Sequence, residues 1–276
     1  MLTEEIKNKI LEFVSLKPRS IDEIAKYIGK NWRTANAYIE RIAKETGLIA
    51  TRVFREGTRG ALKIVYFNVH YEYGSAYQKE LLEKIKLGKK KDDFSAFDIY
   101  QFVPEKNKSA FMEEQRDESK LALNKDLVNL INKSEERILI FSGNLSWADL
   151  IVKGKKFINV LEKILERKKI TVNILTRVDV ESVNRVKNFL SINKRLGRDC
   201  IFIRHREQPL RAIIIDRKIA RLKEIKFGEK KNKYIFYNIY DISWIEWLEK
   251  VFYELFANAV DAEKRIKEME RIVKLK

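Results

Sequence analysis

Polar and basic residues between positions 32 and 59 have the types and spacing to contact nucleic acid. Six of them stand among the apolar positions of a helical pattern: Trp32, Arg33, Thr34, Asn36, Arg41 and Lys44. Arginine can hydrogen-bond guanine, asparagine can hydrogen-bond adenine, and threonine can contact a thymine methyl group or a phosphate. Three arginines follow beside glycines and suit the minor groove or the phosphate backbone: Arg52, Arg55 and Arg59. We predict that these residues bind double-stranded DNA. The alternative is a solvated helix face in a module that binds protein.

A second group of polar residues adjoins apolar segments later in the chain. Arg211 could bind an anion or a sugar hydroxyl beside Asp216, and Asn144 follows an apolar strand predicted over 137–142. Open α/β sheets bind ligands next to the carboxyl ends of their strands. Asn144 is therefore a candidate lining residue of a pocket for a small-molecule or anionic effector, to which Arg211 and Asp216 could contribute. The alternative is that Arg211 begins a surface strand and Asp216 belongs to a tight turn over 216–218.

Nucleophiles and metal ligands are scarce. The sequence contains one cysteine, Cys200, and two histidines, His70 and His205. A single cysteine excludes an internal disulfide and a zinc site built on several thiolates. The sequence has neither a glycine-rich phosphate loop nor a serine nucleophile elbow. We expect no cofactor and no metal, with Cys200 buried and His70 structural.

The composition agrees with a polyanionic partner. Among 276 residues, Lys and Arg outnumber Asp and Glu by 57 to 40, which gives a formal net charge of +17. Such an excess attracts nucleic acid or anionic membranes. A high charge density with one cysteine and three methionines is also typical of a thermophilic protein. The N-terminus does not resemble a signal peptide, and the apolar runs are too short to span a membrane. We expect a cytoplasmic protein without a membrane partner.

Residues 1–72 have the element order of a winged helix-turn-helix. The predicted elements are helices over 4–16, 20–29 and 31–47 and strands over 50–54 and 61–68. Ser20 and Glu23 form a capping box, and Asn31 can cap the third helix. Three helices followed by a hairpin place the third helix in the major groove of DNA. Arg33, Thr34 and Asn36 are then expected at base edges and Arg41 and Lys44 at phosphates. Trp32 is expected either at a phosphate or in packing.

Residues 73–109 are predicted to connect two modules. The charge run over 88–93 is typical of a linker, whereas aromatic and aliphatic residues over 94–103 should dock on one of the modules. A connecting helix is predicted over 110–133.

From residue 110 to 262 the pattern alternates between strands and helices. The predicted strands cover 137–142, 170–175, 200–204, 211–215, 219–222 and 234–237, and the predicted helices cover 157–168, 180–192 and 244–260. Such alternation indicates an α/β sandwich with a mostly parallel sheet. Residues 263–276 should form a basic helix that packs against a partner chain. The fold class is therefore α/β with several domains.

Several segments of this region carry a family resemblance. The run "VNILTR", "IFIRH", "PLRAIIIDRKIARL" and "FYELFANA" resembles one half of the phospholipase D superfamily fold. A winged helix joined to such a domain resembles archaeal transcription regulators of the TrmB-like kind. In the enzymes the signature is His, any residue, Lys, four residues, Asp. Alignment on Asp216 puts Arg211 at the lysine and Pro209 at the histidine, and Lys223 and Glu224 at a later Gly-Ser pair. The resemblance implies a domain that has lost its nucleophile, so the chain is not expected to be an enzyme.

Three functions follow from these observations. The first is a homodimeric, sequence-specific transcription regulator, because phospholipase D-like enzymes combine two halves and this chain holds one. The second is a nuclease, or a protein of DNA repair or defence, that would recruit His205 as nucleophile. The third is an architectural protein that coats DNA without sequence preference.

Overall fold

The computed structural model describes residues 2–46, 48–55, 61–67, 75–114, 125–152, 154–226 and 233–274. The chain divides into two compact units: Met1–Gly74 with Phe256–Asn258, and Ser75–Leu255 with Ala259–Lys276. Within the described ranges, no helix has both the length and the apolar character needed to cross a membrane.

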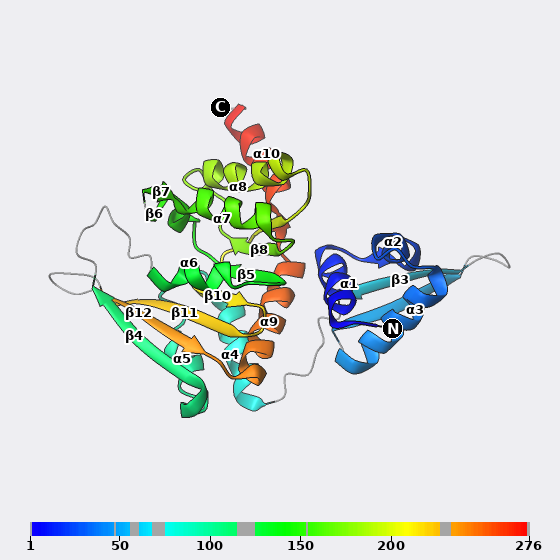
Figure 1. Cartoon of the computed structure of the whole chain (residues 1–276), viewed down its shortest axis with the longest axis horizontal. Coiled ribbons are helices and arrows are strands. Elements are labelled where there is room, and N and C mark those ends of the chain that lie inside the picture. Colours follow the sequence, from blue (N-terminus) through cyan, green and yellow to red (C-terminus); the bar gives the residue numbers. More distant parts are fainter. Residues whose placement is uncertain are drawn as a thin grey trace. The chain divides into compact units, whose positions relative to one another are not determined.

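Unit 1 is built from three helices and a small sheet (Figure 1). Its elements are α1 (Glu4–Leu16), β1 (Arg19–Ser20), α2 (Ile21–Tyr27), α3 (Trp32–Thr46), β2 (Ile49–Arg55) and β3 (Ala61–Phe67). The predicted capping box is confirmed, because Glu23 N donates to Ser20 Oγ (3.1 Å) and Ser20 N donates to Glu23 Oε2 (2.7 Å). Gly29 has a φ of +65°, a conformation that glycine adopts without strain, and turns the chain between α2 and α3.

The sheet of unit 1 contains one strand that the sequence pattern does not reveal. Arg19 and Ser20 pair with Val65 and Ile64 of β3, and the strand order is β1-β3-β2. The pattern over 17–20 predicts a helix stop, and the pairing that converts it into β1 comes from residues far along the chain. With β1 in place, the unit has the complete winged-helix arrangement of three helices and a three-stranded sheet.

Unit 2 contains an eight-stranded mixed sheet with the order β13-β9-β8-β5-β10-β11-β12-β4. Its strands are β4 (Lys108–Glu114), β5 (Arg137–Phe141), β8 (Thr171–Thr176), β9 (Ile201–His205), β10 (Ala212–Ile215), β11 (Ile219–Lys226), β12 (Lys233–Ile239) and β13 (Val260–Asp261). A separate two-stranded ribbon joins β6 (Ile151–Val152) and β7 (Lys155–Lys156).

The predicted mostly parallel sheet is wrong. Only the β5–β8 and β8–β9 pairs among these strands are parallel, and the other five pairs of this sheet are antiparallel. The turn between β10 and β11 explains much of the difference. Lys218 N donates to Ile215 O (2.8 Å) across a tight turn, and a parallel connection would need a crossover of a dozen or more residues.

The predicted helix over 110–133 is wrong in its first part. Residues 108–114 form β4, which pairs with β12, and the helix α6 covers Lys125–Asn132. Phe111 stacks on Phe236 of β12 with ring centroids 5.0 Å apart. Cross-strand packing therefore decides the conformation of this segment over its local helical pattern.

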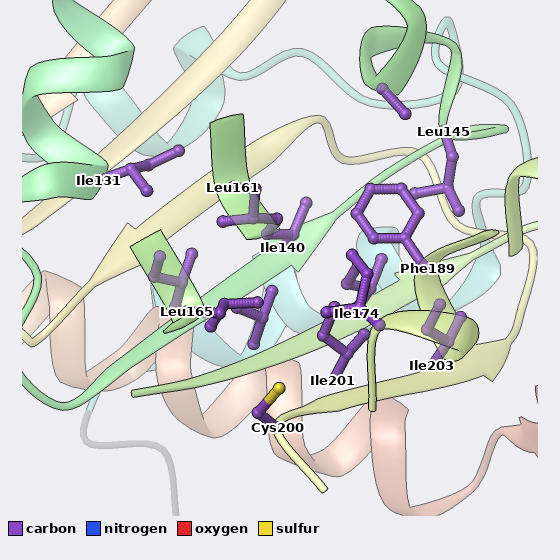
Figure 2. Packing of buried hydrophobic residues seen from close by; sticks show 14 of the residues in the cluster. Ile131, Ile140, Leu145, Leu161, Leu165, Ile174, Phe189, Cys200, Ile201 and Ile203 are labelled. Atoms are coloured by element: carbon purple, nitrogen blue, oxygen red, sulfur yellow. The ribbon is translucent and has the colours of Figure 1, made fainter. Parts of the chain in front are cut away.

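Helices cover both faces of the sheet. They are α4 (Ala76–Leu87), α5 (Phe97–Tyr100), α6, α7 (Phe157–Arg167), α8 (Val183–Leu196), α9 (Ile242–Ala257) and α10 (Ala262–Lys274), with short 3₁₀ turns at Glu105–Asn107 and Ser146–Asp149. Figure 2 shows the core between α7, α8 and the strands, where Leu161, Leu165 and Phe189 meet Ile140 and Ile174. Cys200 is fully buried at the same core, as predicted.

The opposite face packs on α9. Phe141 of β5 meets Phe252 edge to face at 5.1 Å. Arg137 Nη2 donates to Glu249 Oε1 at 3.0 Å, and the side chains of both residues are at most 4% exposed. The aromatic residues predicted to dock also pack within unit 2, because Tyr100 lies 4.8 Å from Tyr237 between ring centroids.

Candidate nucleic-acid interface and basic pocket

The helix α3 turns its polar side outward. Asn31 Oδ1 accepts a hydrogen bond from Thr34 N (2.9 Å) and caps the helix as predicted. Ala35, Ile39 and Ile42 are fully buried, which fixes the rotation of the helix about its axis. The residues that this rotation exposes are Trp32, Arg33, Arg41 and Lys44, while Thr34 and Asn36 are half-buried. Trp32 is 45% exposed, so packing within unit 1 covers only part of this residue.

Asn36 is held in a network that the sequence does not predict. Its Nδ2 donates to Glu40 Oε1 (3.0 Å), and its Oδ1 accepts from Lys63 Nζ of β3 (2.8 Å). Lys63 Nζ also lies 2.9 Å from Glu40 Oε1. The hydrogen bonds from Lys63 and Asn36, with the Lys63 charge, lower the pKa of Glu40. Both ends of the amide expected to read adenine are therefore engaged by this network.

Of the three arginines predicted to contact DNA from the wing, the structure describes the side chain of one. Arg52 is exposed on β2. Arg55 ends β2, but its side chain lies outside the described residues, as do Arg59 and His70.

Unit 2 contains a cavity of about 690 Å³. Residues from α6 and α7, including Leu127, Ile131, Phe157 and Leu161, line it together with residues from β5, β10, β11 and β12. Eight cationic side chains line the same cavity: Lys89, Lys90, Lys91, Arg177, Arg206, Arg211, Arg221 and Lys223. Two carboxylates do so, Asp92 and Glu207. The lining of the cavity thus combines apolar side chains with an excess of basic ones.

Arg211 lies directly before β10 and against the loop that follows β5. Its Nη1 donates to Gln208 O (3.1 Å) and Leu210 O (2.7 Å). A methyl group on Gly143 would come 2.8 Å from Nη2, so the absence of a side chain at Gly143 makes room for the guanidinium. Burial, reinforced by the charge of Arg177, lowers the pKa of Arg211 to about 10. No carboxylate among the described residues lies within ion-pair distance of it.

Lys223 enters the cavity from β11. Its Nζ lies 4.0 Å from the ring centroid of Tyr234. Burial is the main cause that lowers the pKa of Lys223 to about 8; the charges of Arg211 and Lys91 act in the same direction, and Glu113 of β4 opposes them. Within the described ranges no carboxylate oxygen is within 4.0 Å of Nζ. Arg221, two residues earlier, points to the same face of the strand and donates through Nε to Asn238 Oδ1 at 2.7 Å.

The loop after β5 forms one side of the cavity. Ser142 Oγ accepts from Trp147 Nε1 (2.9 Å), and Ser142 O accepts from Gln208 Nε2 (2.9 Å). Leu145 has a φ of +59°, an uncommon left-handed conformation for a leucine. Gln208 is 2% exposed, and its Oε1 has no hydrogen-bond partner among the residues that the structure describes. Such a buried acceptor is costly unless a further donor reaches it.

The charge run predicted as a linker forms the rim of the cavity. Asp93 Oδ2 accepts from Lys89 N (2.8 Å) and Lys90 N (2.9 Å), which folds the run into a compact turn. Gly88 lies so close to Pro209 that a methyl group there would come 2.7 Å from the proline ring.

The structure therefore separates the three predicted ligand-binding residues. Arg211 and Asn144 line the same cavity, whereas Asp216 does not. The Asp216 carboxylate accepts from Ser134 Oγ (3.0 Å) and from the backbone N–H groups of Glu135 (2.6 Å), Glu136 (3.0 Å) and Arg137 (2.8 Å). Asp216 also has a φ of +49° in the tight turn. Its role is the structural one that the alternative predicted.

His205 is placed for structure. Its Nδ1 accepts a hydrogen bond from Val178 N at 2.9 Å, and burial lowers its pKa. It does not line the cavity. No cluster of three or more His, Cys, Asp or Glu that could hold a metal was found over the described ranges.

The fold and these two sites describe a protein with a winged-helix unit and an α/β unit that contains a basic pocket. No family model matches the sequence, and no curated protein matches it. Among solved structures the chain is similar to TrmBL2, described as an archaeal chromatin protein with a novel mode of DNA binding. The identity is 12%, the TM-score is 0.38, and the match covers 94% of each chain. It is also similar to phosphatidylserine synthase of Haemophilus influenzae Rd KW20, at 11% identity and a TM-score of 0.38, over 60% of this chain and 46% of that one.

Proposed function

We propose that this chain binds duplex DNA through unit 1, with α3 as the helix that enters the major groove. The exposed basic residues on the polar side of α3, from its first turn to its last, are the observation that carries the proposal. Arg33 and Lys44 are exposed, and the structure gives neither of them an ion pair within the described ranges. Cations that are already solvated and unpaired lose little when they meet a phosphate or a base edge.

Two kinds of DNA-binding protein agree with this proposal, a transcription regulator and an architectural protein. A transcription regulator needs base contacts, for which Arg33 and Thr34 are suited. The network around Glu40 favours the second kind, an architectural protein, because it engages the Asn36 amide and places a carboxylate on the polar side of α3. Binding would then depend mainly on phosphate contacts and on shape.

A non-enzymatic role for unit 2 and a homodimeric state belong to the same proposal. Val178 N donates to Nδ1 of His205, which supports the first: the proton of the neutral imidazole then lies on Nε2, so neither nitrogen offers the free lone pair that a nucleophile needs. A plasmid-nicking assay with wild type and His205→Ala tests it, and cleavage that the variant loses would contradict it. Light scattering of the full chain tests the dimer.

The decisive measurement is the affinity for duplex DNA of wild type and Arg33→Ala as a function of salt. The matched control is Arg167→Ala, which removes an exposed arginine from the last turn of α7. We expect weaker binding for Arg33→Ala and wild-type binding for the control. If Arg33→Ala binds as wild type does, α3 is not the recognition helix.

The same variants separate the two kinds of protein. For a regulator, Arg33→Ala should reduce binding to fragments selected from the protein's own genome more than binding to random duplex. For an architectural protein the two losses should be equal, and genome-wide binding should be broad.

A further inference from the structure

We propose that the basic pocket of unit 2 binds an organic anion in which a phosphate or carboxylate head is joined to an apolar body. This goes beyond DNA binding, because every lining residue lies between Lys89 and Phe236, outside the winged helix.

The cationic side chains of the pocket favour a ligand with an anionic head group. Eight cationic side chains and two carboxylates line the cavity. Arg211 and Lys223 are the most informative, because neither has a carboxylate within ion-pair distance among the described residues. Buried cations that lack an ionic partner are costly, so an anion bound beside these two side chains would stabilise both. Arginine and lysine are also the side chains that proteins use to hold phosphates and carboxylates.

The apolar part of the lining favours a ligand with an apolar body. Leu127 and Ile131 of α6, Phe157 and Leu161 of α7, and Ile140 of β5 line the cavity. A volume of about 690 Å³ falls in the range of small-molecule sites, which lies at about 300–1,000 Å³. Inorganic phosphate would leave these apolar side chains in water, and a nucleic-acid backbone has no apolar group to cover them. An amphipathic anion can contact both the basic and the apolar side chains of the lining.

Polar atoms of the lining can orient the head. The backbone carbonyls of Gln208 and Leu210 hold Nη1 of Arg211, which fixes the guanidinium beside Gly143. Gln208 Oε1 is buried and has no partner within the described ranges, so it could accept a hydrogen bond from the protonated oxygen of a phosphate monoester, which an ionised carboxylate lacks.

The test is calorimetric titration of the full chain with four probes: octyl phosphate, octanoate, 1-octanol and inorganic phosphate. At least one of the two amphipathic anions should bind about tenfold more tightly than both 1-octanol and inorganic phosphate. The stronger of the two anions identifies the head. Lys223→Met should weaken that binding about tenfold or more. Lys163→Met, an exposed lysine of α7 outside the pocket with the same change in charge, should leave it unchanged.

Several results would overturn the proposal. They are no binding by either anion, equal binding of 1-octanol or inorganic phosphate, and equal loss in both lysine variants. Loss of single-stranded oligonucleotide binding in Lys223→Met, without binding of either amphipathic anion, would assign the pocket to nucleic acid instead. Gly143→Ala gives a second test if Lys223→Met does not fold, because its methyl group would displace the Arg211 guanidinium. None of these outcomes depends on whether α3 binds DNA.

Discussion

Replacing Glu40 by glutamine should strengthen DNA binding and steepen its dependence on salt. In the present structure Glu40 Oε1 lies 2.9 Å from Lys63 Nζ and 3.0 Å from Asn36 Nδ2. The substitution removes a negative charge from the polar side of α3 and frees the charge of Lys63 for a phosphate. One additional phosphate contact changes the slope of log K against log salt by about −0.9. Over a fourfold change in salt, from about 200 to about 50 mM, the advantage of the variant should therefore grow by about 3.5-fold.

Fluorescence anisotropy with a random duplex at several salt concentrations measures this slope. Glu5→Gln is the control, because Glu5 forms a similar exposed pair with Lys9 (2.7 Å) on α1. The control should bind DNA with the wild-type slope. An unchanged slope for Glu40→Gln, or weaker binding, would refute the placement of Glu40 and Lys63 at the DNA.

Three further predictions concern unit 2. Gly143→Ala should weaken binding of the amphipathic anion about tenfold, since a hydrogen bond to a charged group contributes about 1.5–3 kcal/mol. The melting temperature of this variant should stay near that of wild type, because the atoms that the new methyl group displaces lie at the end of the flexible Arg211 side chain. The affinity for that anion should fall as pH rises through about 8, where Lys223 loses its proton. Binding near that pH should be coupled to proton uptake, which calorimetry in buffers of different ionisation enthalpy measures. An affinity that stays constant to pH 9.5 would exclude Lys223 from the site. Glu249→Ala removes the carboxylate partner of the buried Arg137, so the free energy of unfolding in urea should fall by about 3–5 kcal/mol. Simultaneous replacement of Glu249 and Arg137 by apolar residues should recover most of the lost free energy of unfolding. A double variant as unstable as Glu249→Ala would contradict the assignment of the loss to an unpaired buried Arg137.

Local signals in the sequence predict the winged helix well. The capping box at Ser20 and Glu23 and the cap at Asn31 involve residues within three positions of each other, so their geometry is written in the adjacent sequence. The strands β1 and β4 depend on partners much farther along the chain, Val65 and Phe236 among them. A local pattern cannot show those partners, so the sequence predicts a helix stop in place of β1 and a helix in place of β4.

Local sequence signals reveal only part of the basic pocket. Asn144 follows the carboxyl end of a predicted strand, where an α/β sheet binds ligands, and the resemblance to the phospholipase D signature singles out Arg211. Lys223 and the lysines over 89–91 give no such signal, because they reach the cavity from a strand interior and from a charge run that also suits a linker. The two-residue spacing of Arg221 and Lys223 was the available clue, since it puts two cations on one face of an otherwise apolar strand.

The pairing of β4 with β12 also has a consequence for the timing of synthesis. Ser109 Oγ accepts from Asn238 Nδ2 at 3.1 Å, and the two residues are 129 positions apart. At about 5–20 residues per second, β4 leaves the ribosome roughly 6–26 s before its partner. During that interval an unpaired strand can associate with other chains. The charges of Lys108 and Glu113 along β4 would keep the waiting strand apart from its neighbours, as charged residues do on exposed edges.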